Sequence, residues 1–66
     1  MTLGNLLPTL SKNTSLNITL LDDADNEMIT FNAAGWQNIE EDLTQYNVTK
    51  ITVDSNKLIK VKIVSA

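Results

Sequence analysis

The sequence predicts an α+β fold in the order α-β-β-α-β-β, with a four-stranded, largely antiparallel sheet and short helices on one face. Residues 48–64 alternate apolar and polar side chains in two runs with a break at 54–56, which is typical of a β-hairpin. Residues 15–21 and 27–32 have the features of another hairpin, which comes first in the chain. Residues 2–12 instead have the leucine spacing of an amphipathic helix.

The first helix has Thr2 as its N-cap. It places four leucines on one side, namely Leu3, Leu6, Leu7 and Leu10. Pro8 opposes a regular helix, because proline inside a helix removes a backbone hydrogen bond and costs roughly 3 kcal/mol. The sequence leaves open whether Pro8 kinks this helix or divides it into two turns. In either form, the leucines would cover one face of the sheet.

The first hairpin is predicted around an acidic turn at residues 22–26. Its first strand directs alternate residues to the core, namely Leu16, Ile18 and Leu20. Ile29 and Phe31 would join them from the return strand if the loop has an even number of residues, and an inward Met28 is the alternative. A two-residue Ala24-Asp25 tip and a four-residue loop over 23–26 both meet that condition.

The second helix is predicted from Ile39 to Tyr46, after a loop that begins at residue 33. Asn38 and Glu41 have the spacing of a capping box, and Asn47 would end the helix in a left-handed conformation. The apolar face of this segment consists of Trp36, Ile39, Leu43 and Tyr46.

The second hairpin is predicted with a three-residue loop, Asp54-Ser55-Asn56. This loop pairs Ile51 with Ile59 and keeps odd-numbered residues on one face, with Asn56 at a left-handed position. We expect the odd-numbered residues to form a buried face: Thr49, Ile51, Val53, Ile59, Val61 and Ile63.

Composition limits how so short a chain is stabilised. Its 66 residues predict a single domain, 1–66, and a chain of this length buries only about 60% of its unfolded surface. The sequence has no Cys and no His, so we expect neither disulfides nor a metal or other cofactor. A well-packed core or a homodimer formed through the sheet would then supply stability. A soluble cytoplasmic protein without a membrane segment is expected.

Catalysis is not expected, because the usual general base and the strongest nucleophile are both missing. Carboxylates on the exposed acidic turn lack an apolar surrounding that would raise a pKa. Asp23, Asp25 and Glu27 match three ligand positions of a calcium-binding loop, but Met28 and Ala34 occupy positions that require Gly and Glu. We therefore predict a solvated turn with no metal site.

The outward side of the second hairpin is the predicted partner-binding surface. Alternation places five residues there: Lys50, Leu58, Lys60, Lys62 and Val64. A protein partner fits this mixture of lysine and apolar side chains. A nucleic acid is the less favoured partner, because the net charge is −3 and there is no Arg to grip phosphates.

Several local segments together resemble small uncharacterised proteins of bacteriophages and prophages from low-GC Gram-positive bacteria. They are Leu6-Leu7, Asp25-Asn26-Glu27, the helix from Ile39 to Leu43, and the hairpin from Val48 to Ile63. The chain departs from those proteins at Asn26, where they usually have Gly, and at Glu40, where they often have Pro. The resemblance implies a viral or mobile-element origin, and no defined activity.

The predicted function is a small, non-catalytic protein-binding module of phage type that modulates a host or phage protein, as an anti-defence or regulatory inhibitor does. One alternative is a nucleic-acid-binding regulator that uses the lysines at 50, 60 and 62. Another is a structural or assembly subunit of a virion. The sequence leaves the partner, the process and the strand order open.

Overall fold

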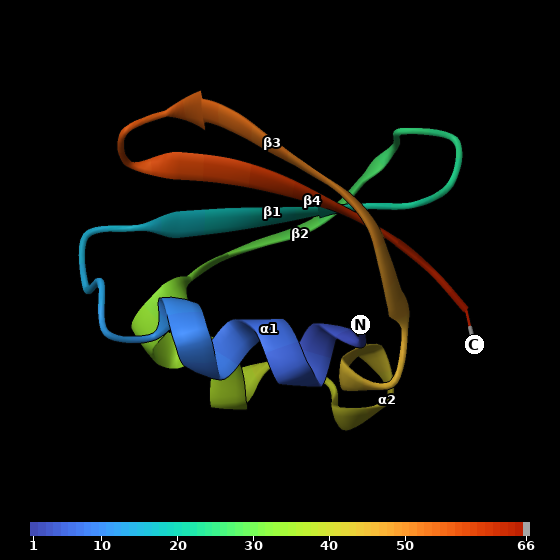
Figure 1. Ribbon diagram of the computed structural model, residues 1–66, viewed down its shortest axis with the longest axis horizontal. Coiled ribbons are helices and arrows are strands. Elements are labelled where there is room, and N and C mark those ends of the chain that lie inside the picture. Colours follow the sequence, from blue (N-terminus) through green and yellow to red (C-terminus); the bar gives the residue numbers. More distant parts are fainter. Residues whose placement is uncertain (66) are drawn as a thin grey trace.

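The computed structural model describes residues 1–65, and its alternating segments form one sheet with helices packed against one side (Figure 1). Two hairpins are separated by a helical segment, and a further helix precedes them. In chain order the elements are α1 (Leu3–Leu10), β1 (Asn17–Leu21), β2 (Glu27–Asn32), the 3-10 helix η1 (Ala33–Asn38), α2 (Glu41–Thr44), β3 (Asn47–Ser55) and β4 (Leu58–Val64).

The strands lie in the order β2-β1-β4-β3. Both hairpins are antiparallel, and they join through a parallel pairing of β1 with β4. This confirms the predicted α+β class with a largely antiparallel sheet. Because β1 and β4 lie in the centre, β2 and β3 are the two edges of the sheet.

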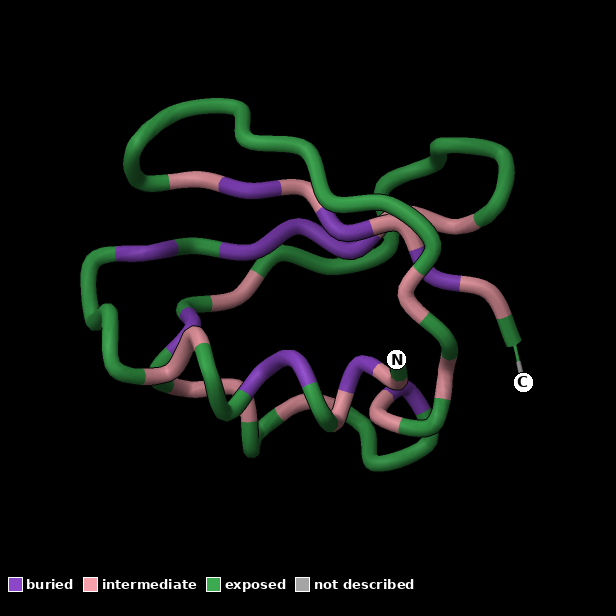
Figure 2. The backbone as a smooth tube through the Cα atoms, in the orientation of Figure 1, coloured by how far each residue is buried: buried purple, intermediate pink, exposed green. Residues whose placement is uncertain are grey.

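The core lies between the central strands and the helical layer, where Figure 2 shows most of the buried chain. Every inward residue of β4 and the predicted inward residues of the first strand are buried. The helices add leucines to the same cluster. Its members are Leu3, Leu6, Leu7, Leu16, Ile18, Leu20, Ala33, Leu43, Ile59, Val61 and Ile63.

α1 is a single helix with Pro8 inside it, which answers the question that the sequence left open. Pro8 is exposed, whereas Leu3, Leu6 and Leu7 are buried and Leu10 packs at the margin of the core. The ring of Pro8 therefore faces away from the sheet. Thr2 precedes the helix as predicted, but its side chain makes no capping hydrogen bond.

The first hairpin keeps the predicted faces, with Leu20 opposite Ile29 and Ile18 opposite Phe31. The predicted loop length is wrong. Leu21 pairs with Glu27, so the loop has the five residues 22–26 and not two or four. A shift of register after Leu20 accommodates the odd loop length, so that the apolar residues still share a face.

The segment between the hairpins is not the helix that the sequence predicts. Residues 33–38 form η1, Ile39 is extended with φ −77° and ψ 164°, and α2 is only four residues long. No capping box forms at Asn38, and Asn47 starts β3 instead of capping a helix. The extended Ile39 turns the chain between two short helices, and the four predicted apolar residues still reach the core.

The register of the second hairpin differs by two residues from the prediction. Ile51 lies opposite Val61 and Val53 opposite Ile59, and the hairpin closes through a turn at residues 56–57. A bulge at Asp54 absorbs the extra residue, so that odd-numbered residues stay on one face. Asp25, with φ 65°, is the one non-glycine residue with positive φ in residues 1–65, so Asn56 is not left-handed.

Burial of that face is also less complete than predicted. Ile51 and Val53 keep 44% and 72% of their surface exposed, although their neighbours on β4 are buried. A second bulge, between Val48 and Lys50, displaces Thr49 from the inward face, and Val48 lies opposite Ile63 in its place. The helical layer covers the centre of the sheet and leaves most of β3 uncovered.

Candidate functional site

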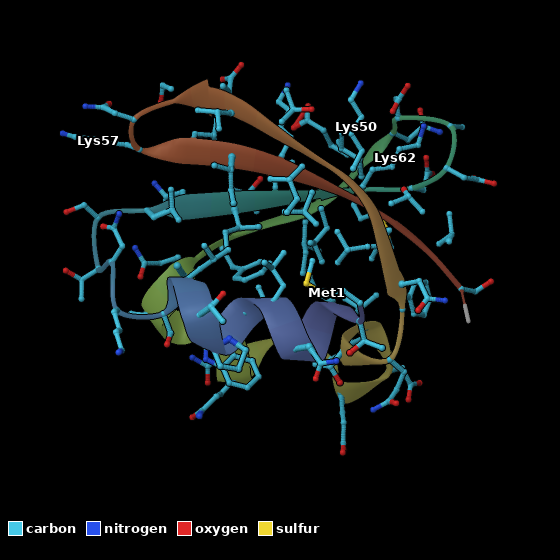
Figure 3. The ribbon with its side chains drawn as sticks, viewed as in Figure 1. Met1, Lys50, Lys57 and Lys62 are labelled. Atoms are coloured by element: carbon cyan, nitrogen blue, oxygen red, sulfur yellow. The ribbon has the colours of Figure 1, made fainter. Side chains whose placement is uncertain are left out.

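The five predicted site residues all lie on the side of the sheet opposite α1, which we call the outer face. On β4, the outward residues Leu58, Lys60, Lys62 and Val64 are half-buried and alternate with buried core residues. Lys50 of β3 lies directly opposite Lys62, and Figure 3 shows both side chains on the side away from α1. The structure therefore brings the predicted residues together.

The outer face extends beyond the second hairpin because β1 lies beside β4. One row of side chains crosses all four strands through Thr30, Thr19, Lys60 and Thr52. A second row crosses through Asn32, Asn17 and Leu58, and a third through Glu27, Leu21, Lys62 and Lys50. The threonines and asparagines of the first hairpin were missed by sequence reasoning, since the strand order was unknown.

Thr19 is the best-packed residue of the outer face. Its side chain is only 2% exposed, and its Oγ1 lies 2.9 Å from Thr30 Oγ1 in a hydrogen bond across β1 and β2. Lys60 lies beside it on β4. Half-buried Leu21, Leu58 and Val64 complete the apolar part of this surface. The outer face thus combines a hydrogen-bonded centre with small apolar areas at its ends.

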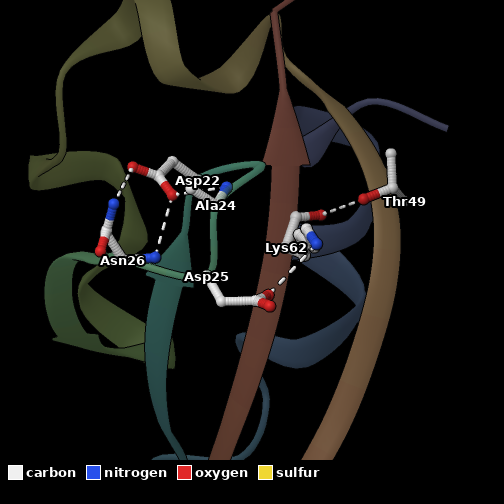
Figure 4. Close-up of polar contacts among 6 residues, drawn as sticks. All are labelled: Asp22, Ala24, Asp25, Asn26, Thr49 and Lys62. Atoms are coloured by element: carbon white, nitrogen blue, oxygen red, sulfur yellow. Dashed lines mark hydrogen bonds and ion pairs between the residues drawn. The ribbon is translucent and has the colours of Figure 1, made fainter.

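One of the three lysines of the outer face is paired. Lys62 Nζ lies 3.2 Å from Asp25 Oδ1, the single ion pair within residues 1–65 (Figure 4). Lys62 also accepts a hydrogen bond at its backbone carbonyl oxygen from Thr49 Oγ1, at 3.3 Å. Lys50 and Lys60 carry the positive charge that is left for a partner, since no carboxylate in this part of the chain pairs with them.

The acidic turn that presents Asp25 is held by Asp22. Asp22 Oδ1 accepts hydrogen bonds from the backbone N–H groups of Ala24 and Asn26, each at 2.9 Å, and Oδ2 accepts one from Asn26 Nδ2 at 3.3 Å. The bond from the Asn26 backbone N–H is the largest cause of a lowered pKa for the Asp22 carboxyl. The other two bonds and nearby Lys62 lower this pKa further, against an opposing effect of desolvation.

The aromatic side chains are not on the outer face. Phe31, Trp36 and Tyr46 pack against the core from the other side of the sheet. Trp36 also lines an open cleft of about 400 Å³ on the helical layer, together with Gly4, Gln37, Ile39, Glu41 and Thr44. Glu41 is the one ionisable group in that cleft, so an acid–base pair is lacking there.

Among residues 1–65, no three carboxylates converge as metal ligands would. Asp25 pairs with Lys62, and the Asp22 carboxylate accepts hydrogen bonds from the backbone of its own loop. No helix in this part of the chain is long and apolar enough to cross a bilayer.

Comparisons with known proteins give no relative from which a function could be transferred. No protein-family model, no curated protein and no solved structure matches the chain. The resemblance to small phage proteins therefore stays a prediction.

Proposed function

We propose that this chain is a non-catalytic protein-binding module that binds its partner on the outer face and thereby modulates a host or phage protein. The observation that carries the proposal is the asymmetry of the sheet. Every helix lies on one side, and the opposite face presents three rows of side chains from all four strands (Figure 1). A broad, uncovered face on so small a domain is a surface on which another protein can dock.

The side chains of this surface indicate the chemistry of the partner. Leu21, Leu58 and Val64 offer apolar contacts, while Lys50 and Lys60 add unpaired positive charge. A partner with acidic side chains around a small apolar area would complement both. The apolar contacts would supply most of the affinity, and the charges would mainly raise the association rate and select the partner.

A protein partner fits better than a nucleic acid. Single-stranded nucleic acids are usually held by aromatic stacking as well as by lysine, and all three aromatic residues pack on the core side of the sheet. Asp25 neutralises Lys62, and Glu27 lies in the same row. The electrostatic potential around the three lysines is therefore mixed in sign, which disfavours the phosphate backbone of a nucleic acid.

The proposal is tested with Leu58→Asp/Lys60→Glu, which reverses the character of the outer face without touching the core. Lys12→Glu is the matched control, because Lys12 is exposed in the segment between α1 and β1. We expect a tagged wild-type chain and the Lys12→Glu control to retain the same specific protein from the cells in which the chain acts. The double variant should lose that protein.

Recovery of identical proteins with all three chains would contradict the proposal. Salt-dependent DNA or RNA binding that disappears with Lys60→Glu would instead support the nucleic-acid alternative. Incorporation of the chain into purified virions would support the structural alternative. Each of these outcomes has its own measurement: quantitative mass spectrometry, filter binding at several salt concentrations, and particle composition.

A further inference from the structure

The edge strand β3 exposes a short segment at residues 50–54, which we call the β3 edge segment; residues 50–53 pair regularly with β4, and Asp54 lies in a bulge. Bulges lie at both ends of its regular pairing with β4. On the other side of β3, the N-terminal segment pairs only with the beginning of the strand. Thr2 forms an antiparallel bridge with Asn47, and the backbone N–H of Val48 donates a hydrogen bond to the carbonyl oxygen of Met1 at 2.8 Å. From Thr49 onward, this edge has no backbone partner within residues 1–65.

The side chains of the β3 edge segment are as exposed as its backbone. Ile51 and Val53 point to the helix side of the sheet but lie beyond the helical cover, at 44% and 72% exposure. Lys50 and Thr52 point to the outer face. Asp54 shares a bulge with Ser55 opposite Leu58, which places it on the outer face too. An edge with this much apolar surface favours the addition of another strand.

The order of residues in this segment indicates which strand it accepts. We propose that the β3 edge segments of two copies of this chain pair antiparallel, with Thr52 opposite Thr52 of the second copy. Ile51 then lies opposite Val53 of the second copy, and Lys50 lies opposite Asp54 of the second copy. By symmetry each contact occurs twice. The segment is thus complementary to itself in both apolar character and charge.

The pairing is specific for one register. A shift of two residues in one direction places Lys50 opposite Thr52, and a shift in the other direction places it opposite Asn56, so the ion pairs are lost in both. Shifts by one residue would place apolar side chains opposite polar ones. A twofold axis perpendicular to the sheet keeps the helix side of one copy next to the helix side of the other. Ile51 and Val53 would therefore meet on that side, and the charges on the outer face.

This dimer does not rest on the proposed function, although Lys50, which would lie opposite Asp54 of the second copy, also belongs to the proposed partner-binding surface. It uses the edge of the sheet and leaves Leu58 and Lys60 exposed, so that two outer faces would form one continuous surface. The N-terminal residues beside Asn47 and Val48 end the pairing, which confines the interface to residues 50–54. An interface of this size makes a dimer whose population depends on protein concentration.

A charge exchange tests the register. Lys50→Asp and Asp54→Lys each place like charges opposite each other, whereas the double variant restores opposite charges in the same positions. The matched controls are Lys12→Asp and Asp42→Lys, which make the same charge changes at exposed sites outside β3. Sedimentation equilibrium over a range of protein concentrations measures the dissociation constant of each chain, and circular dichroism verifies that each is folded.

We expect each single variant to raise the dimer dissociation constant at least about tenfold, the double variant to return it close to the wild-type value, and both controls to leave it unchanged. Val53→Asp should also abolish the dimer, and its exposed position means that the monomer stays folded. A monomeric wild-type chain at millimolar concentration would overturn the proposal. So would a dimer that the single variants do not weaken, or a double variant that remains as weak as they are.

Discussion

The two strands of the second hairpin have the same alternating pattern and very different surroundings. On β4, Val61 is 0% exposed and Ile59 is 8% exposed. Directly beside them on β3, Ile51 and Val53 are 44% and 72% exposed on the same face. β4 lies between two strands and its inward side chains face the helical layer, whereas β3 is an edge that this layer does not cover beyond Val48 (Figure 2).

The difference shows that alternation determines the direction of a side chain but not its burial. Burial requires a second layer, and one helix of eight residues with two short helical turns covers only the central strands. The apolar residues left uncovered then become surface on which another chain can pack. The centre of the sheet supplies stability, and the edge and the outer face are free for interactions.

The largest expected effect comes from truncating the same residue type on the two strands. Ile63→Ala should lower the free energy of unfolding by about 2–5 kcal/mol, because it opens a cavity in the core. Ile51→Ala should lower it by less than about 1 kcal/mol, because half of the side chain is already in water. Urea denaturation at a concentration where the chain is monomeric measures both. Equal losses would show that β3 is covered in solution.

A smaller effect is expected where the helical cover is held together. A Cβ added to Gly4 of α1 would lie 3.1 Å from the carbonyl oxygen of Thr44 and 3.2 Å from its Cβ. Because that oxygen belongs to the backbone of α2, the two helices must separate. Gly4→Ala should therefore destabilise the chain by about 1 kcal/mol or more, although alanine is otherwise the better helix former.

Gly35→Ala is the matched control in η1. A Cβ there would meet nothing closer than Asn38 Nδ2 at 3.7 Å, and φ is −98°, which any residue adopts. Thermal unfolding should show a change within about 0.5 kcal/mol for this variant. If Gly4→Ala raised the melting temperature instead, α1 and α2 would not be in close contact, and the cover over β1 and β4 would be looser than the structure has it.

The smallest effect is expected at the acidic loop, away from the covered centre. The lowered pKa of Asp22 means that its carboxylate stabilises the fold above the ordinary value of 3.8 and loses that contribution as the pH falls through the lowered value. Wild-type stability should therefore decrease from about pH 5 downward. Asp22→Asn should show a shallower decrease in urea unfolding across the same range. An identical pH profile would mean that the loop bonds do not survive in solution.

Sequence reasoning was most successful where one local pattern decides the structure. The alternation in the two hairpins correctly predicted most of the residues that face the core, including Leu20, Val61 and Ile63, but it was wrong at Thr49, where Val48 faces inward instead. It also placed all five predicted partner-binding residues on the face opposite α1. Side-chain direction in a strand follows from the backbone geometry alone, so it needs no knowledge of neighbouring strands.

Sequence reasoning failed where several local structures have similar energies. Residues 33–46 pack their apolar side chains against the core with two short helices and an extended Ile39, as they would with one longer helix. Both loops differ from the prediction because a bulge beside each turn restores the face of the strand at small cost. Loop length and turn type therefore do not follow from the parity of the apolar residues.

Composition and alternation were thus sufficient for the fold class, for the inward side of most strand residues, and for the side of the sheet on which Lys50, Leu58, Lys60, Lys62 and Val64 lie. The tertiary structure decided that β1 lies beside β4, that Thr19 and Thr30 extend the outer face, and that Ile51 and Val53 remain exposed. The physical reason is the range of the interactions. Side-chain direction is local, whereas strand order and burial depend on how much of the sheet one short helical layer can cover.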